Sequence, residues 1–120
     1  MTPFGQKIRH LRKNKGLSQK QMAADLSVSP AYLSALEHGH RGQPNWAMVQ
    51  KVIGYFNLIW DDAEEIEQLA RLSDPRITVD TSGLSAEAVG LVNQLARKIR
   101  SLSPARINHL SQVLDQKEDT

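Results

Sequence analysis

The sequence predicts an all-α protein with five helices followed by a C-terminal helical hairpin. In seven segments, apolar residues recur at spacings of three and four, the period of an amphipathic helix. Ser, Asn or Asp stands directly before most of these segments, where its side chain can cap the helix. Alternation typical of a strand is limited to the neighbourhood of Ile77 and Val79. The 120 residues, of which 40% are hydrophobic, suit one compact domain with an appendage.

The first predicted helix runs from about Pro3 to Asn14 and ends at Gly16. Phe4, Ile8 and Leu11 form one apolar stripe along it, and its basic residues lie elsewhere on the surface.

The stretch from Leu17 to Gly39 predicts two short helices joined by a tight turn. Ser18 caps the first helix, and Ser27 and Val28 form the turn. Ser29 caps the second helix, with proline at its first position, and Gly39 ends it in the left-handed conformation. The residues expected to point inward are Met22, Ala23, Leu26, Leu33 and Leu36.

The opposite face of the second of these helices is small and polar and has no acidic side chain. Such a face suits the major groove of DNA, because bulky or negative groups would be repelled by the flanking phosphates. An ordinary helical hairpin without DNA binding is the alternative. The residues on this face are Pro30, Ala31, Ser34, Ala35 and His38.

The spacing of particular residues over about the first 60 positions resembles the lambda repressor-like, XRE-type helix-turn-helix family. The matching residues are Leu17-Ser18-Gln19, Ala23, Tyr32-Leu33-Ser34, Leu36-Glu37, Gly39, Pro44-Asn45, Val49, Lys51-Val52-Ile53, Tyr55-Phe56 and Leu58.

The resemblance implies a lambda repressor-like DNA-binding domain over residues 1–73, a double-stranded DNA partner and, most often, repression. It also implies that Glu37 pairs with Arg12 of the first helix. Pro30 and Ala31 depart from the long polar base readers of many members, so methyl contact and groove shape gain weight here. The base-reading residues are expected to be Pro30, Ala31, Tyr32, Ser34, Ala35 and His38. The phosphate-binding residues are expected to be Gln19, His40, Arg41, Gln43 and Asn45.

Charge is divided unevenly along the chain, although the net charge is only +2. Residues 1–58 hold eight basic and two acidic side chains, which gives +6, and residues 59–120 hold seven and eleven, which gives −4. Attraction to phosphate is therefore expected in the first half of the chain.

Two more helices are expected before a linker. The fourth runs from about Trp46 to Asn57 with Trp46 as a lid on the core, and the fifth from Asp61, in a capping box with Glu64, to Ser73. The apolar positions Ala63, Ile66, Leu69, Ala70 and Leu72 of the fifth helix are expected to be partly buried. Residues 74–84 are predicted to be an extended linker, with room for one short strand.

Residues 85–116 predict the hairpin, with helices at about 86–102 and 104–116, and residues 117–120 a disordered tail. Each of these helices carries one apolar stripe. Two helices of this size cannot bury both stripes by themselves, so a second copy of the chain is the expected partner. Packing of the hairpin on its own first domain remains the alternative. The expected dimer interface comprises Val92, Leu95, Ile99, Leu102, Ile107, Leu110 and Leu114.

Other classes of function find little support in the sequence. There is no cysteine, signal-peptide pattern or membrane-length apolar run, which predicts a cytoplasmic protein without disulfides. No phosphate loop, activated nucleophile or carboxylate cluster suggests an enzyme, and no cofactor or small-molecule ligand is expected. His38 and His40 lack a third metal ligand, so no metal site is expected. The alternative function is an antitoxin-like or adaptor protein that binds a protein partner.

Overall fold

The computed structural model describes residues 1–40 and 43–116 and divides the chain into two units, Met1–Ile77 and Thr78–Thr120. Each unit is described by itself. Throughout the described residues the regular structure is helical, which confirms the all-α class, and the short strand near Ile77 does not form. The predictions for Arg41 and for a disordered tail at 117–120 lie outside the described residues.

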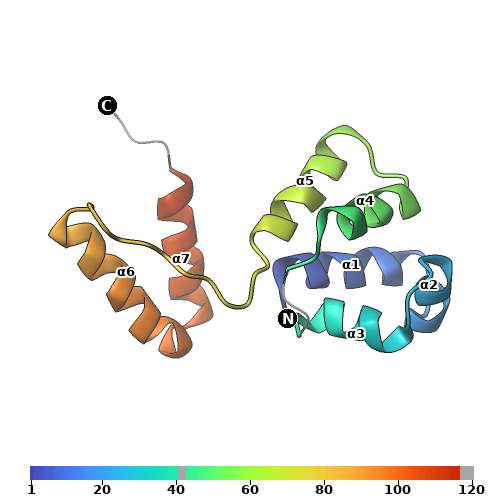
Figure 1. Ribbon diagram of the computed structural model, residues 1–120, viewed down its shortest axis with the longest axis horizontal. Helices are drawn as coiled ribbons and strands as arrows, with labels where there is room; N and C mark the ends of the chain where they lie inside the picture. Colours follow the sequence, from blue (N-terminus) through green and yellow to red (C-terminus); the bar gives the residue numbers. More distant parts are fainter. Residues whose placement is uncertain (41–42, 117–120) are drawn as a thin grey trace. The chain divides into compact units, whose positions relative to one another are not determined.

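The first unit consists of five helices (Figure 1). Helix α1 has the bounds predicted from the sequence. Helix α4 ends at Tyr55, two residues earlier than expected, because Asn57 takes the left-handed conformation. The helices are α1 (Pro3–Asn14), α2 (Gln19–Asp25), α3 (Pro30–His38), α4 (Trp46–Tyr55) and α5 (Trp60–Arg71).

All five helices contribute side chains to one hydrophobic core. The predicted core residues of the first three helices are buried, apart from Leu11 and Val28, which are half-buried against it. The buried apolar residues are Phe4, Ile8, Met22, Ala23, Leu26, Leu33, Leu36, Met48, Val49, Val52, Phe56, Ile66 and Ala70.

The prediction that Trp46 covers the core is wrong, because its side chain is 62% exposed. Met48, Val49 and Val52 define the buried face of α4. With about 100° of rotation per residue, Trp46 at the first helical position projects from the edge of that face. It lines a surface cavity together with Pro44 and Glu67.

The predicted start of the fifth helix is also wrong. Ile59 is the N-cap residue of α5 and gives no side-chain cap, so the Asp61–Glu64 capping box does not form. Asp61 and Asp62 lie in the first turn instead, where negative charge is favourable beside the free backbone amides. Leu72, expected to be partly buried, follows the end of the helix and is exposed.

Two close contacts hold the start of α1 in place. The Ser73 hydroxyl, almost fully buried after α5, donates to the Leu69 carbonyl and accepts from the Phe4 backbone N–H at 2.9 Å. A Cβ atom on Gly5 would lie 2.1 Å from the Glu37 carbonyl oxygen, so only glycine allows α1 to approach α3 this closely. These two contacts therefore hold the start of α1 against α3 and against the end of α5.

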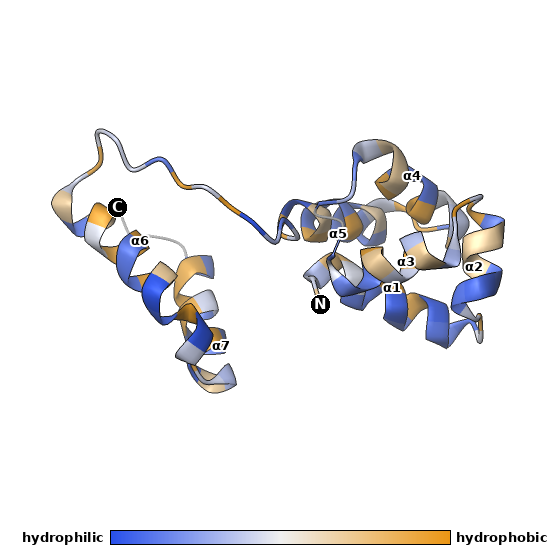
Figure 2. Cartoon of the chain, turned by 60° about the horizontal axis from the view of Figure 1, so that its bottom comes forward, coloured by the Kyte–Doolittle hydropathy of each residue, from blue (hydrophilic) through white to orange (hydrophobic). Residues whose placement is uncertain are grey.

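The second unit contains α6 (Ala86–Lys98), a 3₁₀ turn η1 (Ile99–Ser101) and α7 (Pro104–Asp115). The predicted helix 86–102 thus ends four residues early. The Ser101 hydroxyl donates to the Lys98 carbonyl, and Pro104 favours extended backbone just before it. Both helices carry hydrophobic residues along their length, yet no residue of α6, η1 or α7 is buried (Figure 2).

Candidate nucleic-acid interface

Helices α2 and α3 are each capped by a serine and are joined by a tight turn. The Ser18 hydroxyl accepts from the Gln21 N–H and the Ser29 hydroxyl from the Tyr32 N–H, both at 3.0 Å. Between the helices, Ser27 takes a left-handed φ of 60°. These are the predicted caps, and they set the direction of α3.

Gly39 ends α3 as predicted, with φ of 79°. This conformation is accessible to glycine without strain. A Cβ atom here would also lie 2.5 Å from the Thr2 methyl carbon, so the end of α3 adjoins the start of α1.

The face of α3 that was predicted to read bases is small and mostly exposed. Pro30, Ala31 and His38 are exposed, while Ser34 and Ala35 are half-buried. The structure thus brings these five residues together on one helix. Tyr32 differs, because its half-buried side chain packs against the hydrophobic core.

The one acidic residue of α3 is withdrawn from this face and neutralised. Glu37 is fully buried, and its carboxylate accepts from Arg12 Nε at 3.0 Å and Nη2 at 3.2 Å. Arg12 Nη1 also donates to the Leu17 carbonyl. The pair implied by the resemblance is therefore present, and no negative charge of α3 faces solvent.

The predicted phosphate-binding residues lie in different settings. Gln19, at the first position of α2, donates to the Glu37 carboxylate, and Gln43 donates to the Ala70 carbonyl at 2.9 Å. The Asn45 side-chain oxygen caps α4 through the Met48 N–H.

Two histidines stand at the end of α3. His40 is exposed, and its ring stacks on that of His38 with 5.9 Å between the centroids. His38 Nδ1 donates to the Ser34 carbonyl, which leaves Nε2 as the outward nitrogen.

A contact that sequence reasoning missed fixes α2 against α4. The Tyr55 hydroxyl donates to Asp25 at 2.6 Å, and Gln21 donates to the other oxygen of the same carboxylate. Burial, together with this carboxylate, raises the pKa of Tyr55 to about 12. The bond spans 30 positions of sequence, and no local motif predicts it.

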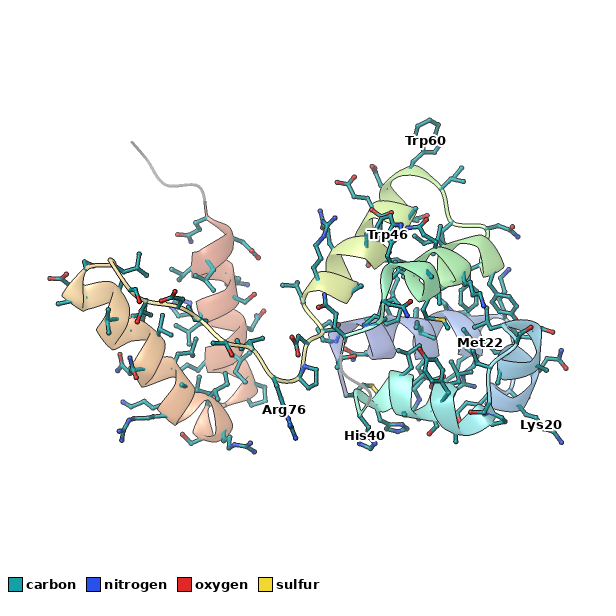
Figure 3. All side chains as sticks on the ribbon, in the orientation of Figure 1. Lys20, Met22, His40, Trp46, Trp60 and Arg76 are labelled. Carbon is teal, nitrogen blue, oxygen red and sulfur yellow. The ribbon has the colours of Figure 1, made fainter. Side chains whose placement is uncertain are left out.

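Exposed basic residues lie on the same side of the unit as α3. Figure 3 shows Lys20 and His40 on this side, and Trp60 on the opposite side, beyond α5. The acidic residues of α5 include Glu65, which pairs with Lys7 at 3.3 Å. The Glu37 carboxylate of α3 is buried, so the exposed surface around α3 can attract a polyanion.

Comparison with known proteins adds an independent line of evidence. A family model described as a helix-turn-helix domain matches residues 3–74. The repressor RghR of Bacillus subtilis is 34% identical over 98 residues, which cover 78% of this chain and 72% of RghR. RghRB, an uncharacterised HTH-type regulator of the same organism, is 34% identical over 62 residues, covering 52% of this chain and 45% of RghRB.

The activator BcrR of Enterococcus faecalis is 27% identical over 93 residues, covering 78% of this chain and 45% of BcrR. The chain thus spans about half the length of RghRB and BcrR. No solved structure matches the chain. In the described part of the chain, no helix is long and apolar enough to cross a bilayer. The chain belongs to the helix-turn-helix family of transcriptional regulators.

Proposed function

We propose that the chain binds specific DNA sequences as a homodimer and represses transcription by occupying promoter DNA. The observation that supports this most strongly is that the exposed face of α3 carries no carboxylate. The one acidic residue of this helix, Glu37, is buried against Arg12. A helix without outward negative charge can enter the major groove, where small side chains allow close approach to base edges.

Base reading is assigned to α3 and phosphate binding to its surroundings. Pro30, Ala31 and His38 offer exposed contacts, and the Ala31 methyl group can touch the methyl group of thymine. Asn45 and Gln19 lie at the starts of α4 and α2, where backbone amides add to the attraction for phosphate. Such contacts fix the protein on the duplex without reading sequence.

Ala31→Gln tests the reading face, because it adds a base-reaching amide without changing charge. We expect duplexes selected from a random pool to differ in sequence between this variant and the wild type. Ala105→Gln is the matched control, since α7 also begins with Ser-Pro-Ala and Ala105 is likewise exposed. If both variants select the wild-type sequence with wild-type affinity, α3 does not read bases.

Dimerisation is assigned to the second unit, in which no described helix residue is buried. Leu95 is 43% exposed and Leu110 is 39% exposed, so the apolar stripes of α6 and α7 are only partly covered within this unit. A second copy would cover them and bring two reading helices to one duplex. Ile99 and Leu102 fall in and after the 3₁₀ turn, so they would form the end of this seam.

Leu95→Asp tests the dimer by placing a charge in the seam. We expect light scattering to report a dimeric wild type and a monomeric variant whose first unit stays folded. Asn93→Asp is the control, because Asn93 lies on the opposite face of α6 and gains the same charge. A monomeric wild type would contradict the dimer. The stripes would then pack on the first domain of their own chain, or bind another protein as the adaptor function requires.

Repression can be separated from activation by the position of the selected site. We expect a reporter to lose transcription when the site overlaps its promoter, since a bound dimer blocks access to that DNA. Increased transcription from a site placed upstream would instead indicate an activator, the role of the relative BcrR.

A further inference from the structure

The segment after α5 brings a basic side chain beside the end of α3. Gly39 and His40 line one surface cavity together with Asp74, Pro75 and Arg76. All five residues belong to the first unit. Figure 3 shows Arg76 on the same side of the unit as His40 and Lys20, with its side chain directed away from α5.

Hydrogen bonds restrain the backbone of the turn formed by residues 74–76. Ser73, directly before it, is anchored to α1 and α5 through its buried hydroxyl. The Asp74 carboxylate then accepts from the Arg76 backbone N–H at 2.9 Å, and Pro75 between them has a fixed φ. The backbone of Arg76 is therefore restricted, while its guanidinium remains exposed.

The Arg76 guanidinium is available to bind an anion. The ion pairs within residues 1–40 and 43–116 are Lys7–Glu65 and Arg12–Glu37, so the Arg76 guanidinium has no carboxylate partner there. The Asp74 carboxylate also lines this cavity, where one of its oxygens accepts the Arg76 backbone N–H and forms no ion pair with the guanidinium. His40 also lines this cavity, and its ring stacks on that of His38 at the end of the reading helix α3.

We propose that Arg76 binds a phosphate of the DNA backbone next to His40, so that residues 74–76 belong to the DNA-binding surface. This inference rests on the proposed function. A guanidinium presents several donors in a fixed plane and matches a phosphodiester well. The contact would lie beyond the C-terminal end of α3 and would extend the protein's footprint along the backbone.

The test uses the full chain and a single duplex selected from a random pool by the wild type. A dimer carries two copies of Arg76, so for Arg76→Gln we expect the slope of log affinity against log salt to become less negative by about 1.8, which is about 0.9 for each phosphate contact. A fourfold rise in salt should therefore weaken this variant about 12-fold less than the wild type. Phosphate ethylation should stop interfering with binding at the outermost backbone position of each half-site.

Two further variants separate this contact from general charge and from a structural role. Arg97→Gln removes the same charge from α6, where Arg97 is exposed and no DNA contact is assigned, so we expect the wild-type slope. Arg76→Lys keeps the charge and should keep most of the slope.

A wild-type slope and ethylation pattern in Arg76→Gln would overturn this inference, and so would an equal slope change in Arg97→Gln. If Arg76 only compensated the dipole at the end of α3, Arg76→Gln would unfold more easily and bind with an unchanged slope. Failure of the wild type to select any duplex would instead overturn the proposed function, which makes the two failures distinguishable.

Discussion

The two units contain helices of similar length but differ in what those helices cover. Helices α1 and α5 have 12 residues each, and α6 and α7 have 13 and 12. The first unit buries thirteen apolar side chains among five helices, whereas no helix residue of the second is buried. The stability of an amphipathic helix therefore depends on how much of its apolar face is covered by other elements.

The difference assigns separate requirements to the two units. The first contains its own stabilising contacts, including a buried ion pair, and can present α3 in a fixed orientation. The second leaves Leu95, Ile107 and Leu110 between 39% and 44% exposed, so its folding is expected to depend on a partner. The following changes test this contrast, beginning with the largest expected effect.

Arg12→Ala should destabilise the first unit most, by about 3–5 kcal/mol, because it leaves the buried Glu37 carboxylate without its cationic partner. Lys7→Ala breaks the exposed pair with Glu65 and should cost at most about 1 kcal/mol. Urea unfolding followed by circular dichroism gives both values. Equal losses of unfolding free energy in the two variants would contradict the claim that burial makes the Arg12–Glu37 pair more important for stability than the Lys7–Glu65 pair.

Ser73→Ala should cost about 1–3 kcal/mol, because the buried Phe4 N–H loses its acceptor. Ser111→Ala, on the exposed surface of α7, is the control and should unfold as the wild type does. Hydrogen exchange at the Phe4 amide would locate the effect. An unchanged exchange rate in Ser73→Ala would contradict the role given to this hydroxyl.

Dilution should separate the units without any mutation. If the second unit folds by pairing, each tenfold dilution lowers its stability by about 1.4 kcal/mol, while the first unit is unaffected. Thermal unfolding over a hundredfold range of concentration should show one transition that shifts and one that does not. Two concentration-independent transitions would mean that the hairpin folds without a second copy.

Asp25→Asn should have the smallest effect and should lower the pKa of Tyr55 only part of the way from about 12, because burial contributes most to the raised value and remains. Because the folded-state pKa is raised, the buried Tyr55 phenol and its bond to Asp25 contribute stability below about pH 10 that is lost as pH rises through about 12. Absorbance titration of the phenol in a Tyr32→Phe background isolates Tyr55, since the chain has two tyrosines. Asp61→Asn should leave the titration unchanged, and an identical curve in Asp25→Asn would exclude the bond.

The sequence predicted the parts of the first unit that depend on local rules. The serine caps, the proline at the start of α3 and the glycine at its end all act within one helical turn, so their residue types were informative. The Arg12–Glu37 pair spans 25 positions and was reached through the family resemblance. Phosphate and base contacts of the predicted residues remain predictions.

The features that were missed depend on tertiary packing. Trp46 looked like a core residue by type, but the position of the buried face of α4 leaves it at the edge. Ser73 and Tyr55 have ordinary sequence surroundings, and their bonds exist only because distant helices meet. Arg76 lies in the segment predicted to be a linker, although the fold places it beside His40.

Selection of duplexes from a random pool, followed by sequencing, tests most directly whether the first unit reads DNA and the second joins two copies. For the wild type we predict an inverted repeat whose half-site centres lie about one helical turn, 34 Å, or a multiple of it apart. For Leu95→Asp we predict the same half-site alone, bound more weakly because the two contacts are no longer coupled. Enrichment of no sequence by the folded wild type, or of the same inverted repeat with unchanged affinity by Leu95→Asp, would contradict the account.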